Sequence, residues 1–237
     1  MKWQGRFSSP ERKRQYVRGL FSTIADRYDL ITVLLSYGQD KRWKRRLVSM
    51  APPAASARIL DLASGTGDIA FEMAAAGGHV TALDITPRML EIARRKPQSF
   101  SGRVSYVVGD MMALPFPDAS FGIVTTGYGL RNVPELSAAL AEIGRVLVPG
   151  GVLLSLDFDK PPNPLTRGIY LGYLTIVGSA LGAFLHGDPD TYRYIPESIR
   201  RYPGAAGVCV LARRAGFRSC EHRSVFGGLM AIHAARK

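Results

Sequence analysis

The chain of 237 residues carries 46% hydrophobic and 21% charged residues, which is ordinary for a globular protein and sufficient for one α/β domain with a buried core. Its formal net charge of +12 indicates attraction to an anionic partner, such as nucleic acid, lipid head groups or an acidic ligand. The basic N-terminus lacks the apolar segment of a signal peptide, so we expect a cytoplasmic protein.

Residues 1–57 are predicted to form an N-terminal helical cap. Ser9 and Pro10 suit the start of a helix. Apolar and aromatic side chains then recur at helical spacing, at Tyr16, Leu20, Phe21, Ile24 and Tyr28. A second helix is expected to carry the basic cluster Lys41–Arg46, and Pro52-Pro53 ends the region.

Residues 58–237 are predicted to form the main domain. Short apolar runs alternate with amphipathic stretches, which is typical of a parallel sheet covered by helices. We expect strands at 58–62, 79–84, 103–108, 121–126 and 151–158, and helices at 68–76, 86–95 and 134–147. A helix at 205–215 and two closing strands, at 217–223 and 227–234, follow.

Residues 160–204 interrupt this rhythm and are interpreted as an inserted lid. Within them, Gly168–Leu185 contains no charge for 18 residues, the length of a transmembrane candidate. Four glycines dilute this stretch, and a span here would split one fold across a bilayer. We therefore favour an apolar lid or a pair of short interfacial helices.

The two cysteines, Cys209 and Cys220, have neither metal-ligand nor redox spacing. We expect both to be reduced residues of the C-terminal part of the domain. With only four scattered histidines in the chain, no metal site is expected.

A glycine-rich loop follows the first predicted strand. The strand reaches Asp61, and Ala63-Ser64-Gly65-Thr66-Gly67 follows at the start of the next helix. The next strand ends at Asp84, 17 positions after Gly67, where a carboxylate can accept ribose hydroxyls. The pattern predicts a nucleotide-type cofactor but leaves NAD open, and a turn without a ligand remains the alternative.

Later features favour S-adenosylmethionine (SAM) over NAD. Gly109-Asp110 follows the third strand, where an acid can bind the amine of an adenine. The chain then closes with a strand pair, whereas an NAD enzyme of this type would continue with a second nucleotide-binding half.

The chain resembles the UbiE/MenG-type C-methyltransferases of ubiquinone and menaquinone biosynthesis. The resemblance spans nearly the whole chain and is most specific in YGLRNV (Tyr128–Val133) and in DTYRYIPESIR (Asp190–Arg200). It implies a Rossmann-like class I methyltransferase fold with a seven-stranded, mostly parallel sheet that ends in an antiparallel strand. It also implies SAM-dependent methylation of a prenylated quinol ring.

The resemblance and the loop pattern together give the expected cofactor-binding residues. These are Asp61, Ala63, Gly65, Thr66, Gly67, Asp84, Ile85, Asp110, Met111 and Gly127. Family members often carry cysteine at the position of Ser64 and serine at that of Gly127, so only the backbone can make the contact at Gly127.

Methylation of a ring carbon needs a base and a donor that stabilises the developing oxyanion. The resemblance places Asp68, Arg131 and Asn132 at the active site. We assign water-mediated proton removal to Asp68, stabilisation of the phenolate to Arg131, and its orientation to Asn132. The alternatives are a helix-dipole role for Asp68 and a structural ion pair for Arg131.

Tyr28, Tyr192 and Tyr194 are candidates to line the ring pocket, with core packing as the alternative. A prenylated substrate links the basic cluster and the apolar stretch to an anionic membrane surface, where we expect peripheral contact. An RNA methyltransferase, a solvated basic face and a SAM-binding scaffold protein are the competing hypotheses, and no RNA-binding module is recognisable. A homodimer is a further expectation.

Overall fold

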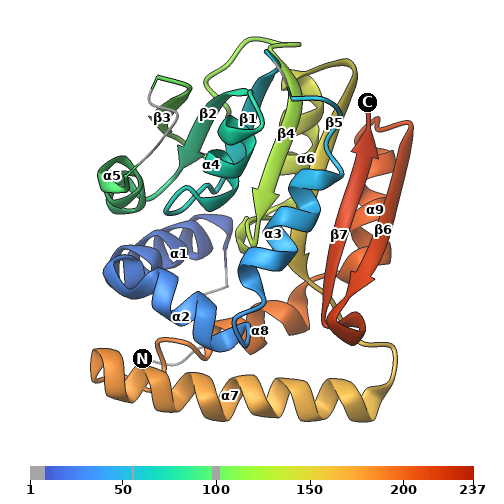
Figure 1. Cartoon of the computed structure of the whole chain (residues 1–237). Helices are drawn as coiled ribbons and strands as arrows, with labels where there is room; N and C mark the ends of the chain where they lie inside the picture. The colour runs from blue at the N-terminus through green and yellow to red at the C-terminus, as the bar shows by residue number, and fades with distance from the viewer. Residues whose placement is uncertain (1–8, 55, 98–101) are drawn as a thin grey trace.

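Seven strands form one sheet in the computed structural model, which describes residues 9–54, 56–97 and 102–237 (Figure 1). The strands are β1 (Arg58–Leu62), β2 (His79–Asp84), β3 (Val104–Val108), β4 (Phe121–Gly127), β5 (Leu147–Phe158), β6 (Ser219–Val225) and β7 (Met230–Arg236). Their order is β3-β2-β1-β4-β5-β7-β6, with β1 to β5 parallel and β7 antiparallel between β5 and β6. The predicted mostly parallel sheet is confirmed. The basic residues 1–8 lie outside the described part.

The helices fall into three groups along the chain. Before the sheet come α1 (Pro10–Ile24), the 3₁₀ turn η2 (Ala25–Arg27), α2 (Tyr28–Leu35) and α3 (Asp40–Ser49). Between the strands lie α4 (Asp68–Ala75), α5 (Pro87–Arg95), η3 (Leu130–Asn132) and α6 (Leu136–Val146). After β5 come α7 (Pro164–His186), α8 (Tyr194–Arg201), α9 (Gly204–Arg214) and η4 (Phe226–Gly228). Tyr28 therefore begins α2 and does not continue α1 as the spacing predicted.

Two apolar clusters cover the two faces of the sheet. On one face, Trp43 and Leu47 of α3 and Met73 of α4 pack against the strands. On the other face, Leu140 of α6 and Val208 of α9 do so. The helices α1, α2, α7 and α8 lie apart from these layers, beyond the carboxyl ends of the parallel strands (Figure 1). They close the edge of the sheet at which parallel α/β folds bind ligands.

The strand β5 starts four residues earlier than predicted. The helix before it ends at Val146, and Leu147 already pairs with Phe121 of β4. The register of this pair shifts between Phe121 and Ile123, and Gly150 adopts a φ of 78°. A local irregularity thus carries the strand through Pro149-Gly150-Gly151, which the sequence indicated as a turn.

The apolar stretch forms one helix, α7, and not the pair of short helices that we considered. Asn163 caps its start by accepting hydrogen bonds from the N–H groups of Leu165 and Thr166, and Pro164 occupies its first turn. Gly187, with a φ of 68°, ends it. Among the described residues, α7 is the one helix that is long and apolar enough to cross a membrane. Only 17% of its most apolar window is buried.

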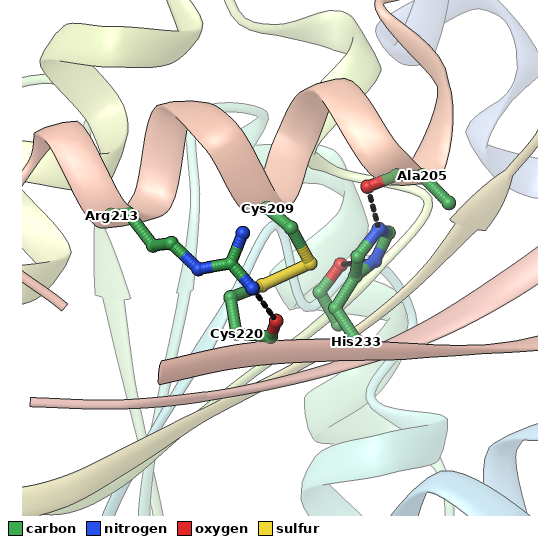
Figure 2. Close-up of a disulfide and its surroundings, with 6 residues drawn as sticks. Ala205, Cys209, Arg213, Cys220 and His233 are labelled. Atoms are coloured by element: carbon green, nitrogen blue, oxygen red, sulfur yellow. Dashed lines mark hydrogen bonds between the residues drawn. A yellow bond between two sulfur atoms is a disulfide. The ribbon is translucent and has the colours of Figure 1, made fainter. Parts of the chain in front are cut away.

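The two cysteines are joined, so the prediction of reduced thiols is wrong. Cys209 of α9 and Cys220 of β6 form a disulfide with their Cα atoms 5.1 Å apart (Figure 2). The chain reverses at Gly216, which has a φ of 95°, and returns as a strand beside the helix. This reversal brings residues 11 positions apart within bonding distance. The arginine Arg213 donates a hydrogen bond to the carbonyl oxygen of Cys220 beside the disulfide.

Reduction of the disulfide is expected to lower the free energy of unfolding by about 2–4 kcal/mol, because the bond closes a short loop in the unfolded chain. The check is the melting temperature with and without reductant. The double variant Cys209→Ala, Cys220→Ala is the control and should melt at one temperature in both conditions. A wild-type melting temperature that is the same with and without reductant would contradict the prediction.

Candidate functional site

Two large cavities lie side by side at the carboxyl edge of the sheet. The first, of about 710 Å³, is bordered by the glycine loop and by the ends of β2, β3 and β4. The second, of about 790 Å³, lies among α1, α2, α7 and α8. Both cavities are partly open, and these volumes include space that faces solvent. Phe21, Tyr28 and Tyr128 line both cavities and form a shared wall between them.

The glycine loop borders the first cavity. Gly67 has a φ of 92°, and a Cβ atom there would lie 2.5 Å from the ring of Phe71. Gly65 has a φ of 55°, and its N–H donates to Asp84 Oδ2 at 2.8 Å. Since both positions need a left-handed backbone, glycine is the residue that fits. The first N–H groups of α4 follow immediately.

The structure brings seven of the ten predicted cofactor residues to the wall of the first cavity. These are Ala63, Gly65, Asp84, Ile85, Asp110, Met111 and Gly127. Asp61 and Thr66 line a smaller neighbouring pocket of about 300 Å³, which shares Ala63 and Gly65 with the cavity. Gly67 lines neither and instead provides the turn into α4.

The carboxylate of Asp84 holds the loop in place. Its two oxygens accept hydrogen bonds at 2.8 Å from the N–H groups of Gly65 and Thr86. Burial raises its pKa above the ordinary value, although these hydrogen bonds act in the opposite direction. The side chain therefore both shapes the loop and presents a carboxylate to the cavity.

Asp61 supports the fit of a polar cofactor beside the loop. Its Oδ1 accepts from Thr125 Oγ1 at 2.7 Å, whereas its buried Oδ2 has no hydrogen-bond partner among the described residues. Burial raises its pKa to about 7. The hydroxyl of Ser64 is likewise buried without a partner in that part of the chain. Buried polar atoms of this kind normally have partners, so they suit the amino-acid end of SAM.

Helix α1 lies over the first cavity. Arg14, Val17 and Phe21 line it from that helix. The Nε atom of Arg14 lies 3.0 Å from Asp110 Oδ2, and Asp110 Oδ1 accepts from the N–H of Met112. The N-terminal helical region thus completes the wall that the strands begin.

Aromatic side chains dominate the second cavity. The predicted Tyr28, Tyr192 and Tyr194 line it, and so does the predicted Arg131. The guanidinium carbon of Arg131 lies 4.7 Å from the ring centroid of Phe158. A flat aromatic ligand fits such walls, and the guanidinium adds one cationic group.

Arg131 also makes the structural contacts that we considered as its alternative role. Its Nε lies 3.3 Å from Asp157 Oδ1, and its Nη1 donates to Ser198 Oγ at 2.7 Å and to Asn132 Oδ1 at 3.1 Å. The same Asn132 Oδ1 accepts from the hydroxyl of Tyr194 at 3.0 Å. Asn132 lines the first cavity, so the pair Arg131-Asn132 reaches both.

Asp68 belongs to a network of charges and lines neither large cavity. Its Oδ2 lies 2.8 Å from Lys44 Nζ, and its Oδ1 lies 3.2 Å from Lys96 Nζ. Burial favours its neutral form, but attraction to the two lysines outweighs burial and lowers the pKa. A carboxylate with a lowered pKa is a weak base.

The same network continues to Tyr128. Lys44 Nζ lies 2.7 Å from Asp40 Oδ2, and the hydroxyl of Tyr128 donates to Asp40 Oδ1 at 2.6 Å. Lys44 is only 7% exposed, although the sequence placed it in a surface cluster. Trp43 is also buried and lines the second cavity. The basic surface of α3 is therefore limited to Lys41, Arg42, Arg45 and Arg46.

Sequence reasoning missed several residues of this site, above all Phe21, Asp40, Lys44 and Tyr128. Tyr128 opens the motif YGLRNV, and Asp40 lies just before the basic cluster, so each carried a local signal. Their pairing did not, because 88 positions separate them along the chain.

Comparison with known proteins identifies relatives over the full domain. The model of the ubiE/COQ5 methyltransferase family matches residues 10–237. The Ubiquinone/menaquinone biosynthesis C-methyltransferase UbiE of Methylobacterium nodulans is 42% identical over 233 residues, which cover 96% of this chain and 92% of that protein. The demethylmenaquinone methyltransferase of Thermus thermophilus is 43% identical over 216 residues, which cover 90% of this chain and 98% of that protein.

Solved structures show the same fold at low sequence identity. A SAM-dependent methyltransferase of Thermotoga maritima, described as a possible histamine N-methyltransferase, superposes with a TM-score of 0.67 and 19% identity, covering 93% of this chain and 99% of that one. A SAM-dependent methyltransferase of Methanococcus maripaludis gives 0.62 and 18%, covering 91% and 93%. The fold is thus the class I methyltransferase fold expected from the sequence.

Replacement of Asp84 by asparagine is expected to weaken SAM binding about 10- to 100-fold, because an amide cannot accept hydrogen bonds at both positions. Isothermal titration with SAM measures this change. Asp118→Ala is the matched control, since that carboxylate lies at the surface in an ion pair with Arg145. Asp84→Asn with wild-type affinity and a wild-type melting temperature would remove Asp84 from the cofactor site.

Proposed function

Because the chain belongs to the ubiE/COQ5 methyltransferase family, we propose that it methylates a ring carbon of a prenylated quinol, either demethylmenaquinol or its counterpart in ubiquinone biosynthesis. It is a SAM-dependent C-methyltransferase of quinone biosynthesis. The observation that carries the assignment of the site is the pair of adjoining cavities, one at the glycine loop and one lined mainly by aromatic side chains.

The chain holds the cofactor through the loop and the strand ends. We assign this role to the ten residues expected from the sequence, with Asp84 and Asp61 as the principal acids. When bound, SAM supplies an electrophilic methyl group on a positively charged sulfonium with its own leaving group. The protein's task is therefore to position and activate the quinol ring.

Arg131 is the cationic side chain that the described residues place in the wall of the second cavity. Its guanidinium stabilises the oxygen as negative charge develops there. Asn132 holds the guanidinium by the 3.1 Å hydrogen bond between their side chains. Tyr28, Tyr192 and Tyr194 provide aromatic walls for the ring. Asp68 acts through Lys44, since it does not line this cavity and its two lysines make it a weak base.

A bilayer surface is the source of such a substrate, and one face of the protein suits it. The outer side of α7 exposes Leu165, Ile169, Ile176 and Phe184, each at least 66% exposed. Helix α2 adds Leu30, Val33 and Leu34. Tyr37, in the turn after α2, stacks on Tyr173 of α7 with ring centroids 5.3 Å apart. We call these eight exposed residues the α2–α7 face.

The α2–α7 face adjoins the opening of the second cavity. Tyr37 and Phe226 line that cavity and are 54% and 42% exposed, so they lie where it meets the surface. The exposed Lys41 and Arg42 begin α3 directly after α2 and provide positive charge for anionic head groups. The enzyme would thus work in the cytoplasm at the membrane surface, with the prenyl tail entering between α2 and α7.

Labelled SAM should transfer its methyl group to a reduced demethylnaphthoquinol or benzoquinol, and not to RNA. Arg131→Ala should lower kcat about 100-fold or more while SAM affinity stays within about twofold, because the cation is needed when the oxyanion forms. The measurement is methyl transfer with the three acceptors in parallel, together with titration of SAM. Transfer to RNA alone, or binding of SAM with no transfer to any quinol, would overturn the proposed function.

Vesicle binding is expected to depend on the α2–α7 face. The protein should bind vesicles containing phosphatidylglycerol more tightly than pure phosphatidylcholine, and salt should weaken binding. Ile176→Glu and Phe184→Glu should each lower the affinity at least about tenfold, because a carboxylate resists insertion among acyl chains. Sedimentation with vesicles measures both effects.

Val210→Glu on α9 is the matched control, since Val210 is 44% exposed on a different side of the sheet and should leave binding unchanged. Equal binding by all variants would contradict the membrane assignment. A dimeric wild type that Ile176→Glu converts to a monomer in size-exclusion chromatography would instead assign this face to a second copy of the chain.

A further inference from the structure

Tyr128 occupies the position where cofactor and substrate would meet. It lines both large cavities and the small pocket beside the glycine loop. Its hydroxyl is directed to Asp40, between Ser36 and Trp43, and these two flanking residues line the second cavity. Tyr128 therefore stands at the boundary of the two cavities, with its hydroxyl directed to α3.

The backbone at Tyr128 is held in a costly conformation. Its φ of 60° lies in the left-handed region, which is unfavourable for a non-glycine residue. A hydrogen bond from its N–H to the carbonyl oxygen of Leu156, at 2.7 Å, holds it there. Strain of this kind is typical of functional positions, and here it directs the ring towards α3.

The proton of the Tyr128 hydroxyl is already engaged in a hydrogen bond. It is donated to Asp40 at 2.6 Å, and Asp40 is 3% exposed and paired with the buried Lys44. A hydrogen bond to a buried carboxylate is charge-assisted and stronger than one to a neutral acceptor. Burial and the neighbouring Asp40 raise the pKa of Tyr128 well above its ordinary value, so the phenol stays neutral. What remains free on its oxygen is acceptor capacity.

We infer that Tyr128, oriented by Asp40, accepts a hydrogen bond from the hydroxyl of the quinol and thereby selects the reduced substrate over the oxidised quinone. The inference rests on the proposed function and adds a specificity-determining residue to it. A quinol offers an O–H donor to the Tyr128 oxygen. A quinone offers only a carbonyl oxygen, which would face another acceptor, and sites built for a donor reject analogues that lack it.

Selection of the quinol serves the chemistry directly, since only the reduced ring is electron-rich enough to attack the methyl group. The Tyr128 hydrogen bond holds one hydroxyl of the ring, and negative charge develops on the other, beside Arg131.

The charges around Tyr128 favour this arrangement. Asp40 and Lys44 face it from α3, Tyr28 from α2, and Asp157 from β5. Lys44 is shared between the buried Asp40 and the partly exposed Asp68, so its ammonium balances both carboxylates. Removing one charge from such a set leaves its partner unpaired, which is costly. A charge network of this kind beside a cavity therefore points to a functional site.

The test compares binding of the two redox states of one ligand. Isothermal titration under anaerobic conditions uses a naphthoquinol with one prenyl unit and its quinone, each with S-adenosylhomocysteine present. The wild type should bind the quinol about tenfold more tightly than the quinone, the value of one hydrogen bond. Tyr128→Phe should abolish this preference. Asp40→Asn should reduce it, because the Tyr128 hydroxyl is then free to donate a hydrogen bond to the quinone.

Tyr202→Phe is the matched control. Tyr202 is 4% exposed, and its hydroxyl has no hydrogen-bond partner within the described residues, so the preference should stay at about tenfold. Equal affinities of the wild type for both redox states, or an unchanged preference in Tyr128→Phe, would overturn the inference while methyl transfer by the wild type stands. A wild type that neither binds nor methylates the quinol would overturn the proposed function as well.

Discussion

The buried ammonium of Lys44 joins the two parts of the molecule that make the site. It lies within 2.8 Å of Asp40 at the start of α3 and of Asp68 at the start of α4. Since α4 begins at the glycine loop, this contact fixes the N-terminal helices relative to the cofactor site. Burying the charges of Lys44 and Asp40 is costly unless both are paired, and here each has a partner, with the partly exposed Asp68 as the second partner of Lys44. The positions of Tyr28 and Tyr128 in the shared wall depend on this alignment, because Tyr28 lies in α2 and the hydroxyl of Tyr128 contacts Asp40 of α3.

The sheet and the glycine loop could be predicted because their signals are local. Apolar runs of four to six residues, the glycines at 65 and 67 and the acid at 84 specify strands, a turn and a binding edge without distant partners. The surroundings of α3 could not be predicted, since the pattern KRWKRR reads as one exposed cluster. Its burial pattern follows from partners on α4 and at Tyr128, directly after β4. The disulfide and the unbroken helix α7 could not be predicted either, because both depend on how the chain returns to the sheet.

The two cavities explain why a methyltransferase fold carries added helices. The strand ends and their loop provide the first cavity. Helices α1, α2, α7 and α8 provide the second, aromatic cavity and the exposed apolar surface beside it. Under the proposed function, a long apolar tail would remain near the bilayer while its ring reaches Arg131. Among the described lysines and arginines, Arg131 and Lys44 are the buried ones.

The central claim is that ring and cofactor occupy adjoining cavities separated by Tyr128. The most direct measurement is a crystal structure of the full chain with S-adenosylhomocysteine and a short-chain quinol. We expect the nucleoside against Asp84 in the first cavity and the quinol ring in the second, with one hydroxyl within hydrogen-bond distance of the Tyr128 oxygen and the other side of the ring near Arg131. A ring bound outside the second cavity, or out of reach of Tyr128, would contradict the account.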